Sequence, residues 1–223
     1  MCAGRCRCRS RCAEVADWLA ERRTEVAADR ILDAADELFT HQDAATVGMN
    51  EIARAARCSR ATLYRYFENR DALYTAYVHR ETHRIFRAIG KEIGWIGDPG
   101  ERLLQGILAA LRSVRESPAL ASWFADTQRP IGGEMAERSE VINALTAAFL
   151  RSLGPTDEDD VEARARWLVR VMISLLVFPG RDEADERTTL QQFVMPVVSP
   201  GQRDSPRRPT AAPSPPGNAR RRR

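Results

Sequence analysis

The sequence predicts an all-α protein, and three observations support this fold class. Apolar residues recur at intervals of three and four along most of the chain. No stretch alternates polar and apolar residues as a strand would, and cap residues or Pro-Gly pairs separate the periodic segments. With 223 residues, the chain has room for a small N-terminal helical domain and a larger helical domain after it.

Charge is distributed unevenly along the chain. The formal net charge is +3, but residues 1–12 carry +4 and residues 200–223 carry +6. The body between them, residues 13–199, is therefore at −7. A body this acidic is not a general binder of polyanions. Any contact with nucleic acid must come from a local basic patch or from the ends of the chain.

The two ends have unusual compositions. Four of the five cysteines lie among the arginines of the first twelve residues, without the paired C-x2-C spacing of a structural zinc site. We therefore predict no metal site and no cofactor, and interpret residues 1–22 as a partly disordered leader with a helix beginning near residue 13. The segment 196–223, rich in Pro, Ser and Arg, is predicted to be a disordered tail.

The sequence shows neither a membrane span nor a secretion signal. No run of 18 apolar residues is present, so we expect no membrane contact. The start of the chain is charged and lacks the apolar segment of a signal peptide, which favours a cytoplasmic location.

Periodicity and caps predict the individual helices. The first covers 13–41, and Thr24 or Asp29 could divide it into two. Asp98-Pro99 and Ser117-Pro118 each place a cap residue before a proline in the first helical turn. Arg129 to Gly133 are predicted to form a loop, and Thr156 with Asp159 to start the penultimate helix. The remaining predicted helices cover 48–56, 60–67, 70–93, 99–116, 117–124, 134–153, 156–178 and 182–194.

The segment 46–67 carries the functional signal. Its first helix buries Ile52 and small alanines, which let a second helix cross at close range. Ser59 can cap that second helix, and Leu63 and Phe67, four residues apart, face inward. The outer face and the exposed N-terminal end then present basic, hydroxyl and aromatic groups of the kinds that contact guanine edges and phosphates. These outer residues are Arg60, Ala61, Thr62, Tyr64 and Arg65.

Residues 26–80 resemble the N-terminal domain of the tetracycline-repressor (TetR) family of bacterial regulators. The matching residues are Ile31 to Phe39, Thr46 before Ile52-Ala53, Ser59-x2-Thr62-Leu63-Tyr64-x-Tyr66-Phe67, and Asn69 to Leu73. The resemblance implies a helix-turn-helix domain over 23–82 and a helical ligand-binding and dimerisation domain over 83–195.

The resemblance also implies roles for individual residues. By this resemblance, the residues that contact the DNA groove are Arg60, Ala61, Thr62 and Arg65. Those that contact the phosphates are Thr46, Tyr64, Tyr66 and Arg70. One position departs from the family, since Arg57 occupies a turn position that is usually glycine. If Arg57 adopts a left-handed conformation, its side chain costs about 1 kcal/mol. Arg57 is either an additional phosphate contact or a solvated substitution, and we favour the second.

The C-terminal half offers a candidate ligand pocket and a candidate dimer surface. In the resembling family the last two helices pair with those of a partner, which here would be 156–178 and 182–194. A pocket between the helices would take a small apolar effector, because few charged residues lie among the candidates. The lining candidates are Phe86, Leu104, Leu108, Trp123, Phe124, Phe149, Trp167 and Met172.

Together these features predict a ligand-responsive homodimeric repressor that binds a palindromic operator in double-stranded DNA. We expect no enzymatic activity, because the sequence holds neither a nucleophile arrangement nor a glycine-rich phosphate loop. The alternative is an all-helical protein-interaction module without sequence-specific DNA binding.

Overall fold

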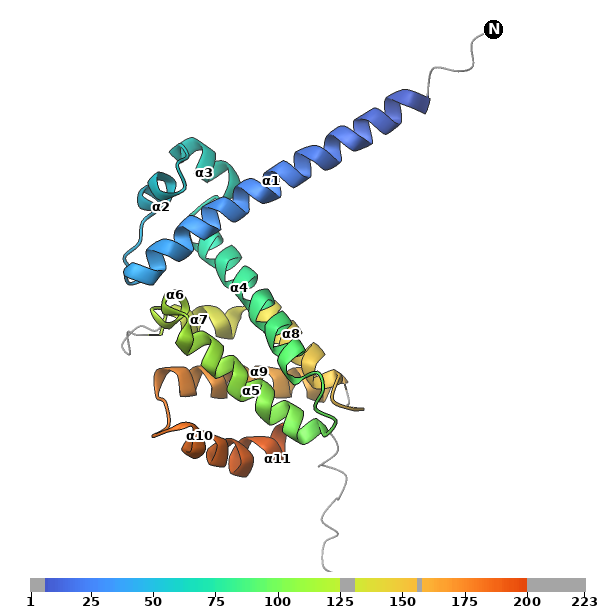
Figure 1. Cartoon of the computed structure of the whole chain (residues 1–223), viewed down its shortest axis with the longest axis vertical. Helices are drawn as coiled ribbons and strands as arrows, with labels where there is room; N and C mark the ends of the chain where they lie inside the picture. Colours follow the sequence, from blue (N-terminus) through green and yellow to red (C-terminus); the bar gives the residue numbers. More distant parts are fainter. Residues whose placement is uncertain (1–6, 125–130, 156–157, 200–223) are drawn as a thin grey trace, which may run out of the picture.

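The computed structural model describes residues 7–124, 131–155 and 158–199. Within these ranges the regular structure is helical and no residue lies in a strand, which confirms the all-α prediction. Helices α1 (Arg7–His41), α2 (Met49–Ala55) and α3 (Arg60–Tyr66) form one end of the molecule. Helix α4 (Arg70–Ile93) starts among them and runs into the second bundle of helices (Figure 1).

Helix α1 is a single helix of 35 residues. Neither Thr24 nor Asp29 interrupts it. Of the two possibilities that the sequence left open, the structure therefore has one continuous helix and not two. The helix begins at Arg7, six residues before the expected start near residue 13, and residues 1–6 lie outside the described part. Its N-terminal part extends beyond the other helices (Figure 1).

The core of the N-terminal end is aromatic and aliphatic. Phe39 of α1 is fully buried and meets the rings of Tyr74 and Tyr77 edge to face, at centroid distances of 5.3 and 5.0 Å. Leu63 and Leu73 are also fully buried. Burying side chains of this size is the main source of stability for so small a unit.

Helices α4 and α5 (Pro99–Glu116) have the predicted bounds, because strong caps fix where each one starts. The Asn69 side chain accepts a hydrogen bond from the Ala72 N–H at 2.8 Å. The Asp98 carboxylate accepts one from the Glu101 N–H at 2.7 Å. A short helix, α6 (Pro118–Ala121), follows its own cap Ser117.

The segment after α6 differs from the prediction in two respects. Gly132 and Gly133, expected in a loop, lie in helix α7 (Ile131–Arg138), where Gly132 permits close packing: a Cβ there would lie 2.9 Å from the Cβ of Trp123. The predicted helix 134–153 is divided, and its second part is α8 (Glu140–Arg151). Extended Ser139 separates the two and caps α8 through the Ile142 N–H at 3.2 Å.

The last helices also depart slightly from the prediction. Helix α9 spans Glu158–Val177, and the predicted cap Thr156 lies outside the described residues. The predicted helix 182–194 appears as α10 (Glu183–Thr189) and a π-helical segment (Leu190–Val194), and α11 (Met195–Val198) extends it. Residues 196–198, predicted to belong to the tail, thus lie in a helix, where Pro196 is tolerated in the first turn and Val198 is buried; the rest of the predicted tail from residue 200 lies outside the described residues.

A partly buried ion pair joins α5, α9 and α10 of the C-terminal bundle. Arg115 of α5 donates two hydrogen bonds to Glu186 of α10, at 2.6 and 2.8 Å, and a third to the Leu175 carbonyl of α9. The Arg115 contact lowers the pKa of Glu186, which is 3% exposed. Among the described residues, no helix has both the length and the apolar character needed to cross a lipid bilayer.

Candidate nucleic-acid interface

The turn between α2 and α3 is left-handed at Arg57, the conformation that the sequence left conditional. Arg57 has φ of 52°, the only positive value at a non-glycine residue in the described part of the chain. This left-handed residue reverses the chain direction, and the Cys58 N–H then returns to the Ala53 carbonyl at 3.0 Å. The turn thus holds α3 across α2 although the glycine usual at this position is absent.

Helix α3 presents one face to the core and one to solvent. Ser59 caps it, because its hydroxyl oxygen accepts from the Thr62 N–H at 3.0 Å and lies 2.9 Å from the Thr62 hydroxyl. Leu63 and Phe67 are buried as predicted. The other predicted contact residues lie outward or at the edge: Arg60, Ala61, Tyr64 and Arg65 are exposed, and Thr62 and Tyr66 half-buried.

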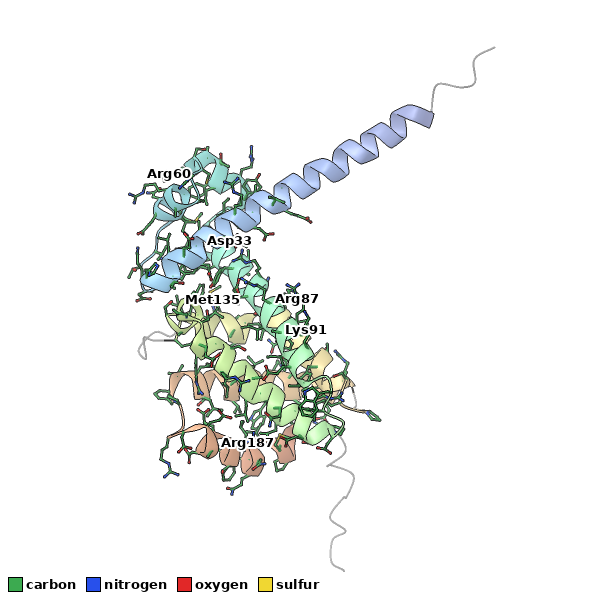
Figure 2. The ribbon with its side chains drawn as sticks, viewed as in Figure 1. Asp33, Arg60, Arg87, Lys91, Met135 and Arg187 are labelled. Atoms are coloured by element: carbon green, nitrogen blue, oxygen red, sulfur yellow. The ribbon has the colours of Figure 1, made fainter. Side chains whose placement is uncertain are left out.

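Four exposed arginines give this end of the molecule a local positive charge. They are Arg54, Arg57, Arg60 and Arg65, and none of them meets a carboxylate among the described residues. Figure 2 shows Arg60 at the α2–α3 end, opposite Arg187 of α10. An unpaired basic patch on an otherwise acidic body is suited to binding phosphates. Arg54 was not among the predicted contacts, although its position on α2, one turn before Arg57, could have indicated it.

The loop before α2 is held by two side chains of α4. The Arg70 guanidinium donates to the Ala45 carbonyl at 2.6 Å and lies over the Tyr74 ring, 4.8 Å from its centroid. The Tyr74 hydroxyl donates to the carbonyls of Ala44 and Val47, the latter at 3.0 Å. Burial raises the pKa of Tyr74 above its usual value, so the hydroxyl remains a donor. Arg70 thus positions the loop, a task in addition to its predicted phosphate contact.

Two more predicted contacts flank the helix. Thr46 is exposed, and its hydroxyl donates to the Asp43 carbonyl at 2.8 Å. The Arg65 guanidinium lies 5.3 Å from the centroid of the Tyr66 ring. Sequence reasoning did not identify Tyr74 as a positioning residue. The sequence did hold one indication of this role: Tyr74 is four residues after Arg70, so both lie on the same face of α4.

The C-terminal bundle holds an apolar cavity of about 320 Å³. Five predicted lining residues lie on its wall: Phe86, Trp123, Phe124, Phe149 and Met172. Three do not. Leu104 and Leu108 are on the face of α5 that packs into the core with Leu168 and Leu190, and Trp167 is 36% exposed on α9. Helical periodicity identifies apolar faces, but it does not distinguish a face that closes the core from one that borders a cavity.

Trp123 borders both the cavity and the N-terminal core. Its ring meets Phe39 edge to face at 5.3 Å and Tyr74 at 5.0 Å. On the other side, the Gly132 N–H donates to the Trp123 carbonyl at 3.0 Å. A change in the cavity wall at Trp123 therefore acts directly on rings that pack beneath the helix-turn-helix.

Comparison with known proteins agrees with this geometry. Residues 31–77 match the family model of the bacterial regulatory proteins of the tetR family. The chain is 65% identical, over 82% of its length and 91% of the relative's, to the HTH-type transcriptional regulator Rv1255c of Mycobacterium tuberculosis.

Solved structures of the same kind are also similar. The crystal structure of the TetR family repressor AlkX from Dietzia, implicated in biodegradation of n-alkanes, has a TM-score of 0.56 and 26% identity, covering 76% of this chain and 93% of that one. The transcriptional repressor QsdR of R. erythropolis has a TM-score of 0.58 at 23% identity, covering 78% and 95%.

Proposed function

The chain belongs to the tetR family of bacterial regulatory proteins, which are DNA-binding transcriptional regulators and not enzymes, and from this premise we propose that it is a homodimeric repressor released from a palindromic operator by a small apolar ligand. The observation that carries the proposal is the exposed face of α3 with its unpaired arginines. As a protein that acts on the chromosome, it would work in the cytoplasm.

In this proposal α3 enters the major groove. Arg60, at the start of the helix, and Arg65 reach base edges or phosphates beside Ala61 and Thr62. Exposed Tyr64 and half-buried Tyr66 donate to the backbone phosphates, and exposed Thr46 would do so by exchanging its hydrogen bond to the Asp43 carbonyl for one to a phosphate. Arg54 and Arg57 lie on the same end of the molecule and extend the basic patch toward the flanking backbone.

Dimerisation is proposed to use the outer faces of the last helices. Trp167 of α9 is 36% exposed, and Phe178, which directly follows α9, and Phe193 are each 67% exposed. Apolar rings as exposed as these are unfavourable in water, and a second copy of the chain that covered them would remove this cost. Two copies also fit the need for paired half-sites, because a single short recognition helix binds weakly.

Regulation is proposed to pass through the apolar cavity. Its wall includes Trp123, which packs against Tyr77 of α4 and against Phe39 of α1. A ligand that favours one position of this ring would shift α4, and with it the spacing of the two recognition helices in the dimer.

The DNA-contact assignment is tested with Arg60→Ala combined with Tyr64→Ala. Both side chains are exposed and neither supports the core, so the variant should fold and dimerise normally. Because each specific contact is worth about 1–3 kcal/mol, we expect at least a thirtyfold loss of affinity in a band-shift assay on duplexes selected by the wild-type protein.

A matched control is Arg87→Ala combined with Trp95→Ala, which removes an exposed arginine and an exposed aromatic ring away from α3. This control should bind DNA like the wild type. Equal affinity of the α3 variant and the control would exclude the proposed contact residues and favour a protein-interaction module instead.

A further inference from the structure

Helix α3 has a narrow outward face, which its buried face locates. Leu63 and Phe67 are buried and stand four residues apart, so they mark the side of the helix that packs on the core. With 3.6 residues per turn, positions 61 and 65 lie on the opposite side. Ala61 and Arg65 occupy these positions, and both are exposed. These two side chains therefore extend most directly from the protein toward a bound duplex.

The side chains of α3 include hydrogen-bond donors but no strong acceptor. From Arg60 to Tyr66 the helix carries two arginines, one threonine and two tyrosines, without a carboxylate or a carboxamide. Asparagine and glutamine pair with adenine through both of its major-groove atoms, and carboxylates accept from the amino group of cytosine. Neither kind of contact is available to α3.

The acceptor side chains near α3 in the sequence are engaged or lie on other elements. The Glu51 carboxylate accepts from the Gln42 amide at 2.9 Å, and the Asn69 side-chain oxygen caps α4. Asn50 belongs to the first turn of α2, and Glu68 lies beyond the extended residue at which α3 ends. The amino groups of adenine and cytosine thus find no matching side chain on the outward face of α3.

Thr62 is engaged in the cap of its own helix. Its hydroxyl lies 2.9 Å from that of Ser59, and the Ser59 oxygen also accepts from the Thr62 N–H at 3.0 Å. One hydroxyl of this pair donates to the other, so one O–H is left for a phosphate oxygen. The reading of base edges therefore rests with Ala61 and Arg65.

The two arginines of α3 are placed differently. Arg65 shares the outward face with Ala61, and its guanidinium lies 5.3 Å from the centroid of the Tyr66 ring, a contact that restricts its conformations. Arg60 is the first residue of the helix and lies one turn before Tyr64, on the flank of the outward face. A flank position is suited to the phosphate backbone that borders the groove.

Resting on the proposed function, we propose that α3 reads guanine and thymine only. Arg65 donates through its two-pronged guanidinium to the N7 and O6 atoms of one guanine in each half-site. The methyl group of Ala61 packs against the 5-methyl group of a nearby thymine, the one apolar group that the major groove presents. Arg60 and Tyr64 bind the flanking phosphates.

The test is a band-shift assay on the duplex that the wild-type protein selects from a random pool, with single bases of each half-site replaced in turn. Deoxyuridine in place of thymine removes only the 5-methyl group and should weaken binding about fourfold per half-site at the contacted position. In place of guanine, 7-deazaguanine removes the N7 acceptor and should weaken binding about tenfold to a hundredfold. Unsubstituted purine in place of adenine removes the amino group and should change the affinity by less than about twofold.

Ala61→Gly should abolish the difference between the thymine and deoxyuridine duplexes. The ratio of two affinities measured on one protein sample does not depend on how much of that sample is folded, so a loss of helix stability cannot imitate this result. The matched control is Ala55→Gly, the same substitution at an exposed alanine of α2, and it should keep the difference.

Arg65→Ala should abolish the discrimination between guanine and 7-deazaguanine, because the side chain that uses the N7 atom is gone. The matched control is Arg60→Ala, which removes the other exposed arginine of the same helix. It should weaken the binding of all duplexes and retain the discrimination.

A wild type indifferent to every thymine replacement, or a deoxyuridine effect that persists in Ala61→Gly, would overturn the thymine assignment. Loss of the 7-deazaguanine effect in Arg60→Ala instead of Arg65→Ala would overturn the guanine assignment. A large loss of affinity with unsubstituted purine would show that adenine is read after all. A wild type that selects no common sequence contradicts the proposed function itself, whereas one that selects a palindrome and fails these tests contradicts only this inference.

Discussion

The indole of Trp123 stacks on the phenol ring of Tyr77, with the ring planes 13° apart and the centroids 5.5 Å apart. Trp123 follows α6 in the C-terminal part of the chain, whereas Tyr77 belongs to the α4 segment that packs under the helix-turn-helix. A residue that borders the ligand cavity therefore completes the core of the DNA-binding domain. Two regions that are separate in the sequence thus depend on one ring.

This shared ring predicts a large effect on stability. Trp123→Ala removes a side chain that is 2% exposed and should lower the free energy of unfolding by about 3–5 kcal/mol, whereas Trp123→Phe should cost less. Urea denaturation of the full chain measures the change. Trp95→Ala, at a tryptophan that is 83% exposed, is the control and should change stability by less than about 0.5 kcal/mol. Similar values for the two alanine variants would contradict the packing described.

Tyr77 predicts a pH dependence. Burial raises the pKa of its hydroxyl, and donation to Asp36 at 2.7 Å raises it further. The folded state thus favours the protonated form. Its contribution to stability is complete below the unfolded pKa of about 10 and is lost as the pH rises above that value. Tyr77→Phe should reduce the alkaline decline in stability, at a cost of about 1 kcal/mol at neutral pH. Tyr64→Phe, at an exposed tyrosine, should leave the decline unchanged, and an unchanged decline in Tyr77→Phe would refute the assignment.

The left-handed Arg57 predicts a stabilising substitution. Glycine adopts this conformation without strain, so Arg57→Gly should raise the free energy of unfolding by about 0.5–1 kcal/mol in a thermal or chemical denaturation experiment. The same variant separates the two roles that the sequence left open. If Arg57 contacts a phosphate, Arg57→Gly should reduce the slope of log affinity for DNA against log salt concentration by about 0.9. If the Arg57 side chain is only solvated, that slope should not change.

The proposed dimer face predicts a change in assembly. Phe178→Glu places a charge on an apolar surface that a second copy would cover, and should raise the dissociation constant of the dimer at least tenfold in sedimentation measurements. Trp95→Glu, at an aromatic position that is 83% exposed and away from α9, should leave the dimer intact. A monomeric wild type, or a Phe178→Glu dimer of unchanged strength, would exclude this face.

Local signals in the sequence predicted the helix-turn-helix well. The bounds of α4 follow from cap residues and from the order of apolar positions within a few residues. The family resemblance, which places a glycine at position 57, pointed to the left-handed conformation that Arg57 adopts. Ser59 and Asn69 are capping residues in the structure, as their positions before helical segments had indicated. Such signals act over one or two helical turns, so a single sequence is sufficient to identify them.

Features that depend on distant neighbours were harder to predict. Gly132 appeared to mark a loop, but its lack of a side chain serves the contact between α7 and Trp123. Leu104 and Phe149 look equivalent by periodicity, yet one closes the core and the other borders the cavity. The loop carbonyls held by Arg70 and Tyr74 lie about 25 to 30 residues away in sequence, beyond the reach of any local pattern.

Selection of bound duplexes from a random-sequence DNA pool by the full-length protein tests the central claim most directly. A dimer with α3 in the major groove predicts a palindrome whose half-sites are centred one helical turn, or a multiple of it, apart. The Arg60→Ala, Tyr64→Ala variant should recover no such sequence from the same pool. Recovery of no common sequence by the wild-type protein, or of one without two-fold symmetry, would contradict the account.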